Sequence, residues 1–279
     1  MKLYVKLFVL FLFLSNNLFA GGPWTPNKNE GTYISGISPV IYKTMSSSNK
    51  SGIDLPRRVS DISQNNYLEY GITDALGLIA NLELKYIGTS KKLFTPNDFM
   101  TSIENGKLFG LGNSQLGLKY NIVNKKVLLS ISYTTEFPAV GKKENLGLRT
   151  GAPTWSFVPG IHFGQGFEKR VYYFFEAYFA ARTNYSHEWR ANAEVGYTFK
   201  KPLSMALWVS MKQSMNNVAV LTHPNYLYTG LYLNNQEFFA WSFKFSYAIN
   251  DKIGVNTALA GGFTLSLIHI SEPTRRHLI

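Results

Sequence analysis

Ser156 and His162 are the residues of this chain that come nearest to a nucleophile and its general base. Such a pair can attack an ester when the hydroxyl lies within hydrogen-bond reach of the imidazole and a third group orients the ring. Both residues fall on the same side of one alternating segment, opposite aromatic and aliphatic residues, and no third group is identifiable. We therefore expect no enzyme activity and interpret His162 as a histidine of an inner wall or an interface.

Metal and cofactor chemistry have equally little support in the sequence. His162, His187 and His223 lie far apart and lack the spacing of metal ligands. The glycines Gly110 and Gly112 do not follow a strand into a helix, so they suit strand bends better than a nucleotide loop. The chain has no cysteine and hence no disulfide framework. The prediction is that the protein holds no metal and no cofactor.

A set of charged residues offers a different kind of chemistry, because its members share the polar side of alternating segments. Mixed charges that face a lumen can line a wet pore, or they can pair into a network that fills it. Both interpretations stay open, and opposite charges on consecutive strands are expected to meet. The candidate lumen-lining residues are Glu69, Glu83, Lys85, Lys119, Glu136, Arg170, Glu176, Arg182, Arg190, Glu194, Lys212 and Lys244.

The elements that would position these charges are strands about ten residues long. In Leu76–Tyr86, apolar residues alternate with polar or small ones, and Ile79 is the one misfit. The same alternation recurs in Trp189–Phe199 and in Phe238–Ile249. A period of two indicates a strand with one face in an apolar medium and one in a polar medium. A water-soluble β-sandwich also alternates, so the period alone does not choose between the two classes.

Strand ends and connections favour a membrane barrel. Trp189 opens its segment while Tyr197 and Phe199 close the same segment, as in the two aromatic girdles of a membrane barrel. Connections alternate between short turns and long loops, such as Thr89–Leu108 and Met215–Gln236. This asymmetry is typical of outer-membrane barrels. The predicted fold is an all-β, antiparallel, transmembrane up-and-down β-barrel.

Composition and the amino-terminal residues agree with an exported membrane protein. Charged residues make up 16% of the chain and aromatic residues 15%, where soluble domains usually carry about 25% charged residues. Residues 1–20 combine Lys2, Lys6, a short apolar run and Ala20 before Gly21, which predicts a signal peptide. Export makes nucleic acid an improbable partner for the net charge of +11. Outer-membrane lipid and small solutes are the expected partners, and the cell outer membrane is the expected location.

The alternating segments number about eleven, from one that begins at Gly31 to one that ends at Phe263. Single-chain bacterial barrels have even strand numbers, so about twelve strands are expected in the native protein. Residues 265–279 have no strand period, and their first eleven residues match the in-frame translation of a transposon adapter used in sequencing libraries. We therefore assign 21–264 to a carboxy-terminally truncated barrel and 265–279 to a non-native tail.

Four stretches, "GGPWTPNKNEGTYISG", "YLEYGITDALGL", "GLGNSQLGLKYNI" and "ANAEVGYTF", resemble small outer-membrane proteins of the MetA-pathway of phenol degradation family, in its XagA-like group. The resemblance implies an outer-membrane barrel with a transport role, and it assigns no functional residue. The expected function is passive passage of small solutes, apolar or aromatic ones in particular. The alternative is a non-conducting barrel with a structural role or with outer loops that bind other surfaces.

Overall fold

A computed structural model of the chain describes residues 21–46, 52–91, 104–139, 141–143, 147–167, 170–199, 202–215, 232, 237–250 and 252–266. The predicted signal peptide, His223 and residues 267–279 of the predicted tail lie outside these ranges. Among the described residues there is no helix long and apolar enough to cross a membrane. The described secondary structure is β throughout.

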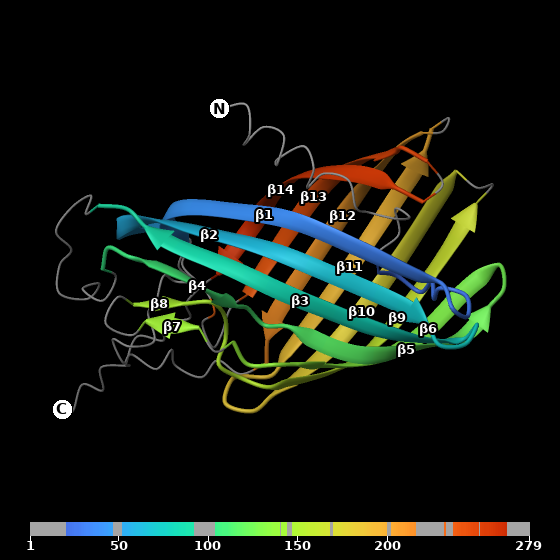
Figure 1. The fold of residues 1–279 in the computed structure, drawn as a ribbon, viewed down its shortest axis with the longest axis horizontal. Coiled ribbons are helices and arrows are strands. Elements are labelled where there is room, and N and C mark those ends of the chain that lie inside the picture. The colour runs from blue at the N-terminus through green and yellow to red at the C-terminus, as the bar shows by residue number, and fades with distance from the viewer. Residues whose placement is uncertain are drawn as a thin grey trace, which may run out of the picture.

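The strands follow one another along the chain with few interruptions (Figure 1). The first six are β1 (Gly31–Ser46), β2 (Gly52–Gly71), β3 (Leu76–Thr89), β4 (Lys107–Leu111), β5 (Gln115–Asn124) and β6 (Val127–Glu136). A two-stranded hairpin follows, made of β7 (Lys142–Lys143) and β8 (Leu148–Arg149). The remaining strands are β9 (Ser156–Phe167), β10 (Val171–Arg182), β11 (Glu188–Thr198), β12 (Leu203–Ser214), β13 (Glu237–Ala248) and β14 (Gly254–Ser266).

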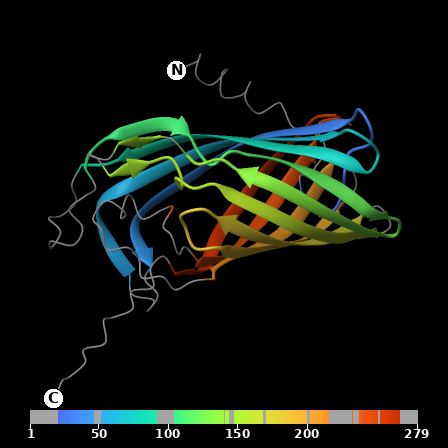
Figure 2. The same cartoon turned by 90° about the horizontal axis from the view of Figure 1, so that it is seen from below.

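All strands but the β7–β8 hairpin form one antiparallel sheet in which neighbours in space are neighbours in sequence. Its order is β1-β2-β3-β5-β6-β9-β10-β11-β12-β13-β14, and β4 pairs with the outer part of β3. The sheet curls, so that β1–β3 cross in front of β10–β14 (Figures 1 and 2). No backbone ladder joins β1 to β14 within the described ranges, so the barrel is not closed there. The predicted all-β, antiparallel up-and-down fold is confirmed, with eleven strands along the path of the sheet.

A break between β4 and β5 lies where the sequence contains "GLGNS". Leu111 pairs with Leu84, and Gln115 pairs with Asn81, so three residues of one strand lie opposite two of the other. The Gly112 backbone N–H donates to the Glu83 carbonyl at 2.9 Å. A Cβ on Gly112 would lie 2.1 Å from a carboxylate oxygen of Glu83, so a larger residue at this bulge would displace the Glu83 side chain.

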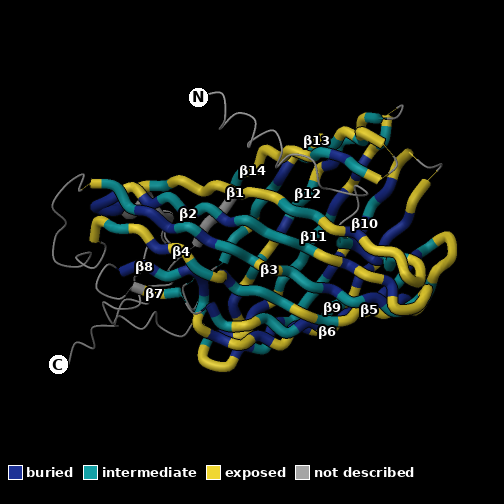
Figure 3. The backbone as a smooth tube through the Cα atoms, in the orientation of Figure 1, coloured by how far each residue is buried: buried dark blue, intermediate teal, exposed yellow. Residues whose placement is uncertain are grey.

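Burial in this sheet is inverted relative to a soluble protein (Figure 3). Large apolar side chains on the convex face are exposed, including Leu82 at 47% and Val195 at 57%. Polar and charged side chains on the concave face are buried, including Lys119 at 1% and Glu69 at 2%. Such a surface is stable where the convex face meets hydrocarbon and the concave face encloses polar contacts.

Two rims with aromatic side chains bound the sheet. At the end that carries the long connections, here called the loop end, Phe137 packs against Trp155 with ring centroids 5.2 Å apart. At the opposite, turn end, Tyr197 packs against Phe199 at 4.9 Å. Strands β9 to β14 are 11 to 13 residues long, whereas β2 has 20 residues. The wall formed by β1–β3 therefore projects beyond the others at the loop end (Figure 1).

Candidate functional site

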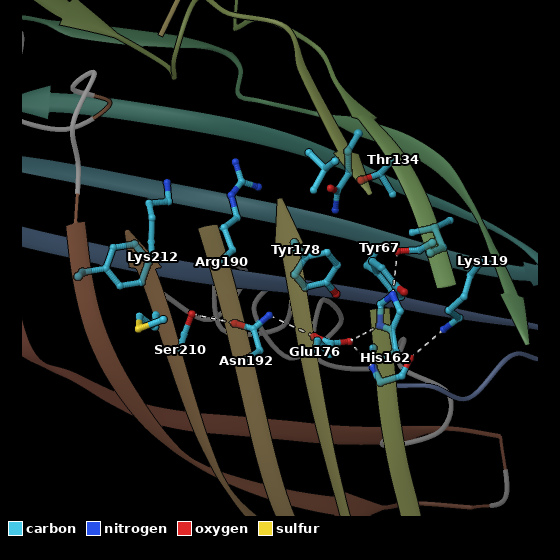
Figure 4. Close-up of a pocket in the computed structure, with 18 residues that line it drawn as sticks. Tyr67, Lys119, Thr134, His162, Glu176, Tyr178, Arg190, Asn192, Ser210 and Lys212 are labelled. Atoms are coloured by element: carbon cyan, nitrogen blue, oxygen red, sulfur yellow. Dashed lines mark hydrogen bonds and ion pairs between the residues drawn. The ribbon is translucent and has the colours of Figure 1, made fainter. Parts of the chain in front are cut away.

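A row of hydrogen-bonded side chains crosses the inner wall at mid-height and joins five neighbouring strands (Figure 4). Ser210 donates to Asn192 Oδ1 at 2.8 Å, and the Asn192 amide donates to Glu176 Oε2 at 3.1 Å. Glu176 Oε1 lies 3.0 Å from Nδ1 of His162, whose Nε2 lies 2.8 Å from the Ser132 hydroxyl. We call these five residues the polar belt.

Part of the polar belt has the composition of a catalytic triad. Ser132, His162 and Glu176 stand in the order nucleophile, base and orienting carboxylate. The nucleophile position is occupied by Ser132 of β6, not by Ser156, which lies on the same strand as His162. Ester hydrolysis also needs donors aimed at the developing oxyanion. The backbone around Ser132 is paired on both sides, with Lys119 of β5 and Gly160 of β9. Its N–H groups therefore form the hydrogen bonds of the sheet and do not point at the Ser132 hydroxyl.

Residues that precede β1 run into the barrel from the turn end and reach the polar belt. The Gly22 N–H donates to Glu176 Oε1 at 2.7 Å, and Lys119 Nζ donates to the Gly22 carbonyl at 3.2 Å. Ser130 donates to the Pro23 carbonyl at 2.6 Å. Gly22 and Pro23 are buried. We call Gly21–Pro26 the amino-terminal segment, and it lies inside the barrel.

Aromatic residues hold this segment against the wall. Trp24 packs edge-on against Tyr172 and Phe174, with ring centroids 5.9 Å away in both cases. Phe174 lies on the inner face of β10 among polar residues, and the indole of Trp24 is its apolar partner. Gly22 has φ 74°, and a Cβ there would lie 2.6 Å from the Trp24 ring. Glycine is therefore required at position 22 for this conformation.

Toward the turn end, the inner charges form short pairs. Lys119 pairs with Glu69, and Lys244 pairs with Glu194. The Tyr172 hydroxyl also donates to Glu194, at 2.6 Å. These contacts leave the carboxylates buried and partnered.

Toward the loop end, three cations gather around two carboxylates. Arg182 contacts Glu188 at 3.0 Å, and Lys212 lies 3.4 Å from Glu188. Arg190 pairs with both Glu188 and Glu136. This cluster joins four strands and has three positive charges for two negative ones. The arrangement suits the binding of an anionic group.

A third charged group lies on β2 and β3 beneath a residue of the long loop before β13. Lys85 contacts Asp61 at 3.1 Å, and the two side chains are 8% and 3% exposed. The Tyr232 hydroxyl donates to Asp61 at 2.6 Å, and the Lys85 ammonium lies 4.5 Å from the Tyr232 ring centroid. Tyr232 has φ 62°, a backbone conformation that bulky residues rarely adopt. The contacts with Asp61 and Lys85 stabilise it in this conformation.

Two cavities follow one another along the interior. A central cavity of about 250 Å³ is lined by Gly21 and Gly22 of the amino-terminal segment, the whole polar belt, Arg190 and Lys212. An outer cavity of about 280 Å³ lies toward the loop end and is lined by Glu83, Glu136, Arg182, Arg190, Lys212 and Tyr232 among others. Arg190 and Lys212 line both cavities and mark the boundary between them; Figure 4 shows both side chains among the residues of the central cavity.

The sequence-derived lumen candidates are placed unequally by the structure. Eleven of them lie on the inner face within the groups described above: Glu69, Glu83, Lys85, Lys119, Glu136, Glu176, Arg182, Arg190, Glu194, Lys212 and Lys244. Arg170 does not, because it is an exposed residue in the turn before β10. The alternation of β10 begins only at Val171, so parity cannot be extended to position 170.

The pairing between strands also differs from the expectation. Register places Arg190 opposite Tyr178 and Glu194 opposite Phe174, so neither faces a charge on β10 directly. Arg182 and Glu188 are the charges that do meet across β10 and β11. Which residues face each other depends on the register between the strands, and a period of two does not determine that register.

Sequence reasoning missed Asp61, Glu188, Asn192 and the amino-terminal segment. Glu188 could have been found by extending the inner parity of Arg190 one step back, since β11 begins at residue 188. Asp61 lies in a stretch of β2 whose alternation is interrupted by polar residues on both faces. Among the described residues there is no cluster of three or more histidine, aspartate or glutamate residues that could hold a metal.

Comparison with known proteins gives a result at the level of the fold. No family model matches the chain, and no curated protein matches it. The crystal structure of the COG4313 outer membrane channel from Pseudomonas putida F1 is similar, with a TM-score of 0.65 over 90% of this chain and 94% of that chain. The chain has the fold of an outer-membrane channel. Sequence identity over this alignment is 12%, so the similarity concerns the architecture of the barrel.

Proposed function

We propose that the protein is a channel of the cell outer membrane through which small solutes pass passively. The observation that carries the proposal is the succession of two cavities along the barrel interior, which meet at Arg190 and Lys212. The exposed apolar outer face supports a location in lipid. The predicted signal peptide and the fold shared with an outer membrane channel support the outer membrane as that location.

The cavity linings favour polar or anionic solutes over the apolar solutes expected from the sequence. Arg182, Arg190 and Lys212 line the outer cavity. A cluster of guanidinium and ammonium groups attracts carboxylate or phosphate groups and orients them by charge-assisted hydrogen bonds. The family resemblance to MetA-pathway proteins remains a prediction, because no family model matches the chain.

The proposal is tested by conductance of the purified mature protein in planar bilayers. Lys212→Gln removes one cation from the boundary between the cavities and is expected to shift the reversal potential in a salt gradient toward cation selectivity. Lys125→Gln removes the same charge from an exposed turn and should leave the reversal potential unchanged. A reversal potential that shifts equally in both variants, or that shifts in neither, would contradict an ion path between Arg190 and Lys212.

A non-conducting barrel is the second candidate, and the amino-terminal segment favours it. That segment and its contacts with Tyr172 and Phe174 occupy the turn end of the interior. If neither the mature protein nor a variant that lacks residues 21–25 conducts, the channel proposal fails and a structural or surface-binding role is preferred.

A further inference from the structure

Glu176 is a buried carboxylate. Its ion pair with His162 exists only when the imidazole ring is protonated. Glu176 is 5% exposed, and it accepts hydrogen bonds from His162, Asn192 and Gly22. Within the described part of the chain, no lysine or arginine forms an ion pair with it, and His162 supplies a charge only when protonated. These hydrogen bonds stabilise the charge of the carboxylate, and a positive group beside it would stabilise that charge further.

The amino-terminal segment brings such a group to the right place. Gly22 donates its N–H to Glu176 Oε1, and a side-chain carbon on Gly21 would lie 3.6 Å from the same oxygen. Gly21 also lines the central cavity. The backbone immediately before Gly22 therefore adjoins the carboxylate.

Cleavage of the predicted signal peptide would convert the backbone nitrogen of Gly21 into a cation. Hydrolysis of the Ala20–Gly21 bond adds one water, leaving a carboxylate on Ala20 and an α-ammonium on Gly21. We infer that this α-ammonium is the counter-ion of Glu176, so that the inner wall contains a binding site for the mature amino terminus of its own chain.

Several independent contacts fix the segment in the orientation that this site needs. Lys119 and Ser130 bind the carbonyls of Gly22 and Pro23, while Trp24 packs against Phe174. The positive φ of Gly22 turns the chain so that its N–H points to Glu176 while its carbonyl points to Lys119. The cleavage step thus supplies the last charge of a site that is otherwise built by the barrel wall.

The test is the reactivity of the α-amine in the folded mature protein purified from outer membranes. A water-soluble acylating reagent is applied near pH 7, and the amino-terminal peptide is quantified by mass spectrometry after unfolding and digestion. A free α-amine reacts readily under these conditions because its ordinary pKa, about 7.7–8, lies below that of lysine. Wild-type protein should be protected, and Glu176→Gln should react about ten-fold faster, as expected for loss of a charge-assisted bond.

Glu194→Gln is the matched control, because it makes the same change at a buried carboxylate of the next strand that already has Lys244 as its partner. It should leave the α-amine protected. A second variant inserts two glycines between Ala20 and Gly21; it moves the amine away from Glu176 with the wall intact and should also restore reactivity. Folding of all variants is checked by heat-modifiable mobility in gels.

The inference is overturned if the mature chain does not begin at Gly21, if wild type reacts as fast as the Glu176→Gln protein, or if Glu194→Gln deprotects the amine equally. These outcomes do not depend on conduction. A protected amine in a barrel without conductance would keep the inference and reject the channel, whereas a reactive amine in a conducting barrel would do the reverse.

Discussion

At the scale of single residues, the barrel interior holds groups that could react but that the surrounding backbone commits to structure. Ser132, His162 and Glu176 have the spacing of a triad. Glu176 also receives the Gly22 N–H, and the backbone on both sides of Ser132 belongs to sheet ladders. These three residues therefore serve best as a hydrogen-bond relay that positions Glu176.

The first prediction follows from this relay. Ser132 is not expected to react with a fluorophosphonate probe, because the backbone N–H groups beside its hydroxyl are committed to the sheet and are not free to stabilise an oxyanion. The measurement is mass-spectrometric detection of the adduct in folded protein, with Ser156→Ala as a control for the neighbouring serine. Stoichiometric labelling at Ser132 that is lost in His162→Ala would show that the relay is an active hydrolase.

The second prediction concerns the buried pair formed by Lys85 and Asp61. Asp61→Asn should lower the free energy of unfolding by about 3 kcal/mol, because the buried Lys85 ammonium loses its closer carboxylate and keeps only Glu83, at 3.6 Å. The double change Asp61→Leu with Lys85→Met should cost less than this single change. Urea unfolding in detergent measures both, and equal losses would mean that water reaches the pair.

At the scale of the strand, the outer apolar stripe is the feature on which membrane insertion depends. Val195 lies within β11, four residues before Phe199, which follows the last residue of the strand, and both side chains are exposed. Val195→Arg should cost about 2–4 kcal/mol in a bilayer, whereas Phe199→Arg near the interface should cost about 0–1 kcal/mol. Reversible unfolding in phospholipid vesicles gives both values. Equal costs would argue against a lipid-facing stripe.

The strands and their inner charges were predictable because a period of two is a direct consequence of strand geometry. Ile79, the one misfit of its segment, is buried against the central cavity. The partners of the charges were not predictable, since Arg190 reaches Glu136 of β6 across two intervening strands. The amino-terminal segment has no period at all, and one sequence trace of its position is Phe174, a large apolar residue on the mostly polar inner face of β10.

At the scale of the whole molecule, the open seam between β1 and β14 bears on the strand count. An unpaired edge inside a membrane is costly, because its backbone N–H and carbonyl groups find no partner in hydrocarbon. We propose that the native gene continues beyond Thr264 with a loop and one more strand that closes the barrel. Resequencing the source DNA should replace the adapter-like codons after Thr264 with a further alternating segment. An intact gene that encodes the present tail and then stops would contradict this prediction.

The unequal lengths of the strands affect how a solute approaches the opening at the loop end of the barrel. At about 3.3 Å per residue, β2 is about 66 Å long, while a 12-residue strand such as β13 is about 40 Å long. In a bilayer, the side formed by β1–β3 would extend further from the membrane than the connection between β10 and β11, which is short. A large molecule that approaches the loop end would therefore meet the ends of β1–β3 first, whereas a small solute could enter over the β10–β11 connection.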